Sequence, residues 1–505
     1  MARLTLLVAV LLLPALALAN TDFPRPAELQ KDVNFWVRIY SQVDTNSGLL
    51  HDPWDLGVVY ERLSLPANAS NGERQRLIDQ GKARYQAALR QLAAGKRDNL
   101  TDAERNALNA WPRGTPAARF HQAAADVRFQ LGQADRFKAG LIRSGQWRPH
   151  IHQTLAEFGL PRELDVLPHV ESSFNPSAYS KVAAAGMWQF MPGTARQYMV
   201  VDHLMDERMD PYVSTRAAAQ LLKTNLRITG TWPLALTAYN HGAGGISRAA
   251  KAMGTTDIAT LVRHYRGPAF GFASRSCYVS FLAALEVDRH AEKYFGPVAM
   301  AKPIDYDVIT LDHYLHAATL ARALGTGTDT LRSYNPSLLD PIWSGEKRIP
   351  RGFRLKFPRN QLSQPLAQAI AAIPAEQRFA QQQPDVLHRI ARGETLSHIA
   401  RRYGVGVKEL MALNGLRNHT IRAGQSLRLP GNAGVGAGAA LASRESTGAA
   451  RSSGPSVYVI QPGDSLWGIA RRFNRTENEL VAWNGLTNKH RIMPGDTLKV
   501  ALNDR

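Results

Sequence analysis

The stretch VLPHVESSFNP, Val166–Pro176, places one carboxylate, Glu171, between an apolar run and two serines. No other Asp or Glu occurs from Val166 to Val201, and Pro161 in GLPREL marks the start of the helix expected to carry it. A carboxyl group in an apolar setting is costly to ionise, so its pKa rises and it holds a proton near neutral pH. Such a group suits general acid catalysis. By its local pattern alone, Glu171 is better explained as a solvated helix-end residue or a cap for the serines.

Two motifs further along the chain change this balance. AAAGMWQFMPGTARQY, Ala183–Tyr198, ends one element at Pro-Gly-Thr and starts another helix. WPLALTAYNHGAGGISRA, Trp232–Ala249, is an apolar helix that runs into Ala-Tyr-Asn and a glycine-rich turn. Glycines permit close backbone approach, and amides, a phenol and a thioether can line a sugar-binding groove. Each motif alone is also compatible with an ordinary core.

Taken in order, LPRELDVLPHVESSFNPSAYSKVAAAGMWQFMPGTA and LALTAYNHGAGGISRA resemble the lytic transglycosylases with a goose-lysozyme-like catalytic domain. The resemblance covers residues 147–297 and implies a mainly α-helical, lysozyme-like catalytic domain. The chain departs from many relatives at Ser274-Arg275, where they carry Glu-Thr before the Tyr-Val matched by Tyr278-Val279.

The resemblance also implies a role for each matching residue. By this resemblance, Glu171 is the catalytic acid and base, and Ser172 and Ser180 orient the glutamate or the substrate. Gln189 and Met191 are expected to line the groove. Tyr239 and Asn240 are expected beside the scissile sugar, with Tyr239 hydrogen-bonded toward Glu171.

The reaction implied by the family uses a single carboxyl group. Glu171 would protonate the oxygen between N-acetylmuramic acid and N-acetylglucosamine, then take the proton of the C6 hydroxyl as a 1,6-anhydro ring closes. Neither a metal nor an organic cofactor is implied. A lysozyme-type muramidase that adds water, and an inactive cell-wall-binding scaffold, are the alternatives.

An internal repeat identifies the C-terminal modules. HRIARGETLSHIARRYGVGVKELMALNGL, from His388, matches YVIQPGDSLWGIARRFNRTENELVAWNGL, from Tyr458, at a constant offset of 70. Each copy is expected to fold as strand, helix, helix and strand, with the first helix capped after a Gly-acid-Ser/Thr turn. The copies resemble LysM, a small α+β (βααβ) module that binds N-acetylglucosamine-containing glycans. We therefore predict LysM modules over residues 386–430 and 457–501, and the whole chain resembles the lytic murein transglycosylase D-like family.

A third, degenerate copy is predicted over residues 304–358. Asn335 matches Asn414 at an offset of 79, but Tyr314 stands where the turn glycine is expected. Glycan binding and structural packing are both open for this copy. The Gly, Ala and Ser-rich segment 431–456, GNAGVGAGAALASRESTGAARSSGPS, is expected to be a flexible linker.

The N-terminal end has the layout of an export signal. Residues 1–19 combine Arg3, an apolar run and an Ala-x-Ala arrangement, which predicts a cleavable signal peptide and a periplasmic or envelope-associated protein. The lone cysteine, Cys277, is expected to be a buried hydrophobe, and no lipobox cysteine follows the signal, so only peripheral association with the envelope is expected. Residues 20–146 read as a helical region, whose Phe35, Trp36 and Trp54 are expected in a core.

The charge is strongly basic. The 505 residues carry a formal net charge of +19 and a pI near 10.1. For an exported chain this favours anionic envelope polymers, here peptidoglycan glycan strands, over nucleic acid as the partner.

Overall fold

The computed structural model describes residues 22–384, 386–416, 418–429, 457–460, 469, 477–486 and 496–500. The chain divides into two compact units, residues 1–398 with 405–432, and residues 399–404 with 433–505. The predicted signal peptide and the predicted linker 431–456 lie outside the described residues. Among the described helices, none combines the length and the apolar character needed to cross a bilayer.

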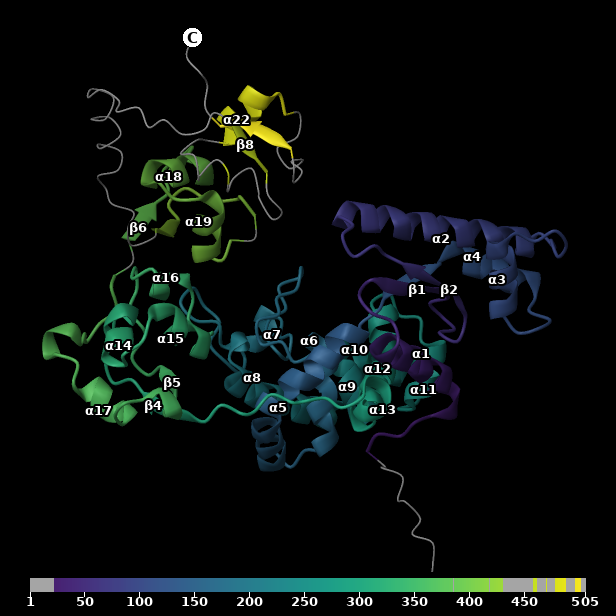
Figure 1. The fold of residues 1–505 in the computed structure, drawn as a ribbon, viewed down its shortest axis with the longest axis horizontal. Helices are drawn as coiled ribbons and strands as arrows, with labels where there is room; N and C mark the ends of the chain where they lie inside the picture. The colour runs from purple at the N-terminus through teal and green to yellow at the C-terminus, as the bar shows by residue number, and fades with distance from the viewer. Residues whose placement is uncertain are drawn as a thin grey trace, which may run out of the picture. The chain divides into compact units, whose positions relative to one another are not determined.

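Helices of residues 134–295 surround one buried helix, α12 (Phe272–Arg289) (Figure 1). Every α12 residue from Ser274 to Leu285 is buried, as expected of a helix at the centre of a core. Its neighbours are α1 (Gln30–Ser41), α6 (Leu167–Ser172) and α9 (Trp232–His241). The bundle is completed by α5 (Ala134–Glu157), α7 (Pro192–Ala195), α8 (Pro211–Thr229), α10 (Ala243–Met253), α11 (Ile258–His264) and α13 (Ala291–Phe295), with the 3₁₀ helices η1 (Ala27–Leu29), η2 (Arg162–Val166) and η3 (Glu207–Met209).

The core of this bundle begins well before residue 147. Phe23, Val33 and Tyr40 are buried with residues of α5, α9 and α12 in one hydrophobic cluster. The phenol of Tyr278 on α12 donates a hydrogen bond to the carbonyl of Pro24 at 2.6 Å. The N-terminal segment is therefore part of the structure that supports the catalytic region.

The remainder of the N-terminal region contains a sheet that the sequence analysis missed. Its strands β1 (Ser47–His51), β2 (Val59–Ser64) and β3 (Arg128–Leu131) are antiparallel in the order β2-β1-β3. Helices α2 (Asn71–Ala93), α3 (Asp102–Ala110) and α4 (Ala117–Ala125) pack with it around a second core. Strands of four to six residues show too little periodicity to be separated from short apolar helix segments.

Aromatic residues of this region divide into two groups. Phe35 and Trp36 are buried, as predicted. Trp54 is 41% exposed, so its predicted place in a core is wrong.

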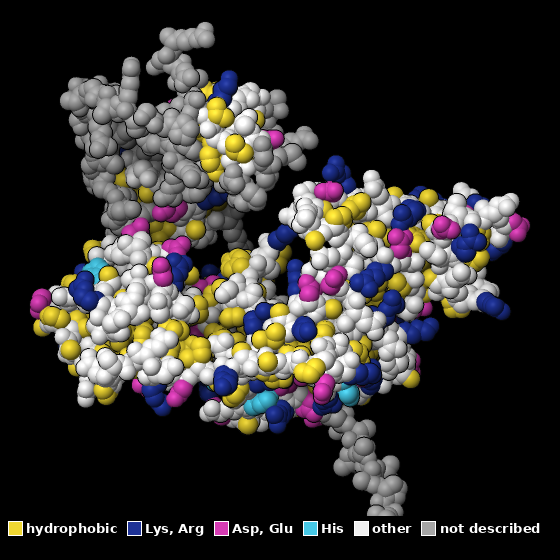
Figure 2. Space-filling model, viewed as in Figure 1, with side chains coloured by type: hydrophobic (Ala, Val, Ile, Leu, Met, Phe, Trp, Pro, Cys, Tyr) yellow, Lys and Arg dark blue, Asp and Glu magenta, His cyan; other side chains and the backbone are white. Residues whose placement is uncertain are grey.

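On the face seen in Figure 2, Lys and Arg side chains are spread over α2 and its neighbours, with Asp and Glu between them.

The predicted degenerate copy folds as a module of its own. Strands β4 (Tyr306–Thr310) and β5 (Arg354–Pro358) are antiparallel and enclose α14 (Ala317–Ala323), α15 (Thr328–Tyr334) and a short extra helix, α16 (Asp340–Trp343). After η4 (Arg359–Gln361), α17 (Leu366–Ala371) adds Leu366, Ala369 and Ile370 to the module's core, and η5 (Ala375–Gln377) follows. We call residues 304–373 the docked module.

The two C-terminal modules have paired strands as predicted. In the first, β6 (Val386–Arg389) pairs with β7 (Ser426–Leu429), and α18 (Leu396–Tyr403) and α19 (Val407–Leu413) lie between them in sequence. In the second, β8 (Val457–Val459) pairs with β9 (Thr497–Lys499), and α22 (Glu477–Asn484) precedes β9.

One asparagine holds the same position in all three modules. Asn335 donates to the carbonyls of Leu331 and Lys356 and accepts from the Lys356 amide, each at 3.0 Å. Asn414 makes the equivalent bonds to Leu410 and Arg428, and Asn484 makes them to Leu480 and Lys499. The amide thus ties the end of the second helix to the last strand. This shared contact explains why the asparagine is repeated in the sequence of the degenerate copy.

The docked module is attached to the segment that joins the helical bundle at residues 204–210. Asp206 donates its amide to the Ser337 carbonyl at 2.8 Å, and Leu339 donates to Leu204 at 2.9 Å. Lys356 on β5 forms a buried ion pair with Asp210, which also caps the start of α8 by accepting from the Tyr212 amide. Because a buried charge needs its partner, this pair fixes the docked module at one place on the bundle.

The asparagine contact gives a stability prediction. Replacing Asn335 by Ala leaves the buried Lys356 amide and two carbonyls without partners, so the free energy of unfolding should fall by about 2 to 3 kcal/mol. Gln361→Ala removes only exposed hydrogen bonds to Tyr334 of the same module and should cost below about 0.5 kcal/mol. Denaturant unfolding of the two variants measures the contrast; equal losses would contradict it.

Candidate active site

Glu171 lies in the last turn of α6, directly before a strained reversal of the chain. Ser173 and Phe174, which end the helix, have φ values of 52° and 57°, in the left-handed region that non-glycine residues rarely adopt. Two nitrogen atoms of Arg143 donate to the Ser173 carbonyl at 3.1 and 2.6 Å. Phe174 is fully buried against the ring of His169. These contacts hold a conformation that the local sequence alone would not favour.

A buried polar network supports α6 from behind. His169 contacts Asp288 Oδ1 at 3.2 Å, and Arg148 forms an ion pair with the same carboxylate. Burial lowers the pKa of His169, although the hydrogen bond to Asp288 opposes this effect. No local pattern in the sequence predicts this network, because its members are far apart along the chain and belong to no recognisable motif.

The carboxyl group of Glu171 opens into a pocket of about 390 Å³. Six of the seven predicted site residues line this pocket. Its lining consists of Glu171, Ser180, Val182, Ala184, Gln189, Phe190, Met191, Thr194, Leu221, Tyr239 and Asn240. Glu171 is the one acid among these lining residues. Ser172, the remaining predicted residue, lies next to the pocket without lining it.

Burial decides the protonation state of Glu171. It raises the pKa of this carboxyl to about 8, while a long hydrogen bond from Asn240 Nδ2 to Oε1, at 3.5 Å, works in the opposite direction. Glu171 therefore carries a proton at neutral pH.

In the described part of the chain, no group of three or more His, Cys, Asp or Glu residues is placed to hold a metal ion.

Asn240 is supported by the chain's lone cysteine. Its amide also points at Cys277 Sγ, 3.4 Å away, and the Cys277 thiol donates to the Leu236 carbonyl at 3.2 Å. Burial raises the pKa of Cys277 to about 12, so the group stays a neutral thiol. The prediction of a buried cysteine is confirmed, but its contact with Asn240 was not foreseen.

Tyr239 does not make the predicted hydrogen bond to Glu171. Its phenol donates instead to the carbonyl of Trp188, at 2.8 Å. Burial, with a further contribution from the Glu171 charge, raises the pKa of Tyr239 well above its ordinary value. The tyrosine is thus a neutral wall residue that ties α9 to the loop of residues 178–191, which we call the groove loop.

The two predicted serines and Gln189 shape the groove loop. Ser172 Oγ donates to the Met187 carbonyl at 2.8 Å, and Ser180 Oγ accepts from the Ala184 amide at 2.9 Å. Gln189 has a φ of 48°, and its Nε2 donates to the Gly186 carbonyl at 2.8 Å. Met191 remains 45% exposed at the pocket wall, where it can contact a ligand.

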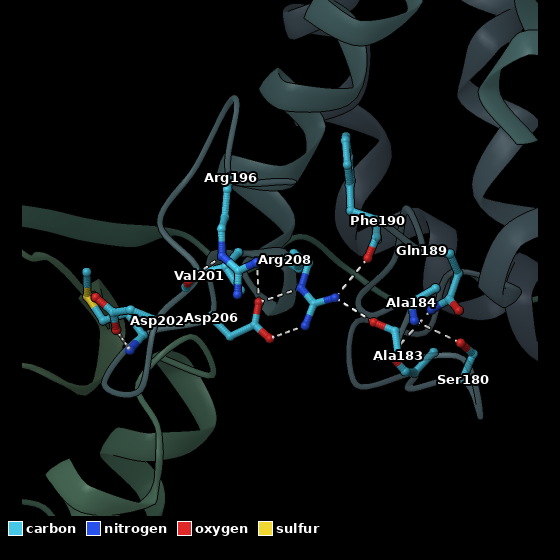
Figure 3. Close-up of polar contacts among 12 residues, drawn as sticks. Ser180, Ala183, Ala184, Gln189, Phe190, Arg196, Val201, Asp202, Asp206 and Arg208 are labelled. Carbon is cyan, nitrogen blue, oxygen red and sulfur yellow. Dashed lines mark hydrogen bonds and ion pairs between the residues drawn. The ribbon is translucent and has the colours of Figure 1, made fainter. Parts of the chain in front are cut away.

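Arg208 clamps the groove loop and was missed by the sequence analysis. Its guanidinium binds both oxygens of Asp206, at 2.8 and 2.7 Å, and donates to the carbonyls of Ala183 and Phe190 at 2.6 and 2.9 Å (Figure 3). Gly186 lies against this segment so closely that an added Cβ would be 1.7 Å from the Arg208 carbonyl oxygen. Because Asp206 also donates to Ser337, the docked module and the groove loop share one support.

The raised pKa of Glu171 has a consequence for stability. The unfolded carboxyl ionises near its ordinary value of 4.5 and the folded one near 8, so stability is lost as the pH rises between these values. Glu171→Gln removes this loss, and its gain in Tm over wild type should grow from pH 5 to pH 8. Calorimetry across this range tests it, and a difference in Tm independent of pH would count against a raised pKa.

The Arg208 clamp predicts local loosening when it is cut. Arg208→Met leaves the buried Asp206 unpaired and should destabilise the fold by about 3 to 5 kcal/mol, with faster amide hydrogen exchange across residues 180–191. Arg208→Lys keeps the charge without the two-pronged geometry and should show a smaller effect. Arg196→Lys, an exposed neighbour, is the control. Unchanged exchange in Arg208→Met would refute the clamp.

Two domain families match segments of this chain. The transglycosylase SLT domain matches residues 151–262, and the LysM domain matches residues 388–430 and 458–501. N-acetylmuramoyl-L-alanine amidase sle1 of Staphylococcus aureus (strain USA300) is 40% identical over 116 residues, 23% of this chain and 34% of the amidase. A solved structure of an inactive mutant of lytic transglycosylase Slt from Pseudomonas aeruginosa is 18% identical, covers 45% of this chain and 34% of that chain, and has a TM-score of 0.25.

A longer match extends over most of the chain. Membrane-bound lytic murein transglycosylase D of Escherichia coli (strain K12) is 30% identical over 354 residues, which are 67% of this chain and 72% of that protein. With the SLT and LysM matches, this similarity shows that the chain belongs to the lytic murein transglycosylase D family.

Proposed function

We propose that this protein cleaves the β-1,4 bond between N-acetylmuramic acid and N-acetylglucosamine in peptidoglycan and leaves a 1,6-anhydro-N-acetylmuramic acid end. The observation that carries the proposal is the single protonated carboxyl, Glu171, in a pocket where it is the one acid among the lining residues. Glycosidases with two carboxylates place one on each side of the bond, whereas enzymes in which the substrate assists need only one. Family membership supports the same reaction.

The proposed mechanism uses Glu171 twice. Its proton passes to the glycosidic oxygen as the bond to the anomeric carbon breaks, and the acetamido group of the same sugar stabilises the developing positive charge. The ionised Glu171 then takes the proton of the C6 hydroxyl, whose oxygen bonds to the anomeric carbon. Glu171 thus gives up one proton and regains one, and no water molecule is consumed. This suits a poorly hydrated carboxyl.

Neutral groups around Glu171 suit both steps. Asn240 donates to the carboxyl at 3.5 Å and so favours the ionised form when the proton has left. Tyr239 and Cys277 stay uncharged and add no opposing charge. Gln189 and Met191 line the wall where an acetamido group or sugar face would lie.

The substitution Glu171→Gln tests the proposed mechanism. It should lower kcat/KM on purified sacculi by at least about 10² to 10⁴-fold. In the wild type, kcat/KM should fall as the pH rises above about 8, where the acid loses its proton. Glu292→Gln, an exposed carboxyl on α13, is the matched control. Near-normal cleavage by Glu171→Gln would make the assignment untenable.

Product mass separates the alternatives. Anhydromuropeptides are lighter by one water than the products of a lysozyme-type muramidase. Mass analysis of fragments from wild-type digestion should show the lighter series. Binding of sacculi without any soluble fragment would instead favour an inactive scaffold.

The LysM match supports a place in the cell envelope. We further propose export through the signal of residues 1–19 and a periplasmic location with peripheral attachment. The two C-terminal LysM modules would span residues 386–430 and 457–501, joined by the linker 431–456. Tethered glycan-binding modules raise the effective concentration of the catalytic pocket at an insoluble polymer.

Deleting residues 431–505 tests the role of the last module. Sacculus binding in a pull-down should weaken by several-fold, because one of two linked binding events is lost. Cleavage of soluble glycan should stay close to that of the full chain. Equal sacculus binding by the truncated protein would contradict a tethering role.

A further inference from the structure

Trp54 is presented on an ordered loop at the surface. The carboxylate of Asp52 accepts hydrogen bonds from the amides of Trp54 and Asp55, both at 2.8 Å. The indole itself is 41% exposed, although its neighbours Asp52 and Leu56 are buried. The loop thus leaves part of the Trp54 side chain at the surface.

Guanidinium groups gather around this ring. The guanidinium carbon of Arg275 lies 3.5 Å from the ring centroid, and that of Arg266 lies 4.4 Å from it. A third arginine, Arg128, lies over Phe272, the first residue of the helix that carries Arg275, at 4.1 Å from its ring centroid. The cluster of Trp54, Arg266 and Arg275 is called the Trp54 cluster below.

Three arginines, Arg266, Arg275 and Arg128, bring positive charge to the Trp54 cluster and its surroundings. Arg275 is 8% exposed, and its Nε is buried with no hydrogen-bond partner in the described part of the chain. Burial lowers the pKa of Arg275 to about 10, and the charges of Arg266 and Arg128 add to this effect. The carboxylates of Asp126 and Asp32 act in the opposite direction, but Asp32 is already paired with Arg263. A buried guanidinium with an unpartnered donor is costly, so the cluster is suited to receive an anion.

Two contacts and two peptide links connect the Trp54 cluster to the catalytic acid. Asn240, which reaches Glu171, is followed by His241, whose Nδ1 lies 2.9 Å from Ser274 Oγ. Ser274 is followed by Arg275. These are the positions where the chain carries Ser-Arg instead of the Glu-Thr of many relatives: Ser274 stands in place of the acid, and Arg275, which contacts Trp54, stands in place of the threonine.

We propose that the Trp54 cluster is a binding subsite for the peptide stems of peptidoglycan, which carry free carboxylates. The arginines would bind a carboxylate, and the exposed indole would pack against the sugar or the peptide that bears it. This inference rests on the proposed function, because it takes peptidoglycan as the substrate. It adds a preference for strands that retain their peptides.

The test compares glycan strands that carry peptides with strands stripped by an amidase, using the full chain. The ratio of kcat/KM for the two substrates should exceed one in the wild type. It should fall by about two- to fivefold in Arg266→Glu, since an exposed charge pair contributes up to about that factor. Trp54→Ala should lower the ratio as well. Arg76→Glu, an exposed arginine on α2 with the same change in charge, should leave the ratio unchanged.

A binding measurement keeps this test independent of the reaction. In a Glu171→Gln background, the affinity for soluble peptide-bearing fragments should drop when Arg266→Glu or Trp54→Ala is added, and the drop should shrink at high salt for Arg266→Glu. If neither variant changes the substrate ratio or the affinity beyond Arg76→Glu, the subsite is refuted. Failure of the proposed function would instead appear as absent anhydro products with the binding differences retained.

Discussion

The energetic cost of ionising Glu171 is the constraint on which the site depends. A carboxyl group at the end of a short helix would ordinarily reach water and ionise, but here it faces a pocket whose walls are apolar or neutral. The helix that carries it ends in two non-glycine residues with left-handed backbone, and buried contacts from Arg143 and His169 hold that reversal. Moving the carboxyl toward solvent would restore its ordinary pKa and remove its proton at neutral pH.

Around this carboxyl the protein uses neutral hydrogen-bonding groups. Asn240 bridges Glu171 and the Cys277 thiol, and Tyr239 turns its phenol away to the Trp188 carbonyl. A cation beside Glu171 would lower its pKa and weaken it as an acid. The strong charges lie one layer further out, in the Asp206–Arg208 pair that supports the groove loop and in the Asp288 network behind α6.

The docked module shows how a repeat can take on a structural role. It keeps the asparagine that ties helix to strand in the two C-terminal modules, so its internal fold is the same in kind. Yet its Ser337 carbonyl and Lys356 ammonium contact the catalytic helices, next to the residues that clamp the groove loop. The sequence left both glycan binding and structural packing open for this module. These contacts support structural packing.

The sequence by itself determined the helical catalytic region, the strand-helix-strand modules and most of the pocket lining. These features reside in local patterns: the apolar helix before Ala-Tyr-Asn, the glycine-rich turn after it, and the asparagine repeated at a fixed spacing. Glu171, Ser180, Gln189, Met191, Tyr239 and Asn240 do meet at one pocket.

Only the tertiary structure decided what surrounds those residues. Arg208, Cys277 and Asp288 act through contacts between segments distant in sequence, which no local pattern records. The sheet β2-β1-β3 was missed because its short strands lack a distinctive period, and Trp54 was misplaced because an aromatic residue has no local signal for exposure. The tertiary structure also decided the pKa of Glu171, because burial is a property of the packed chain.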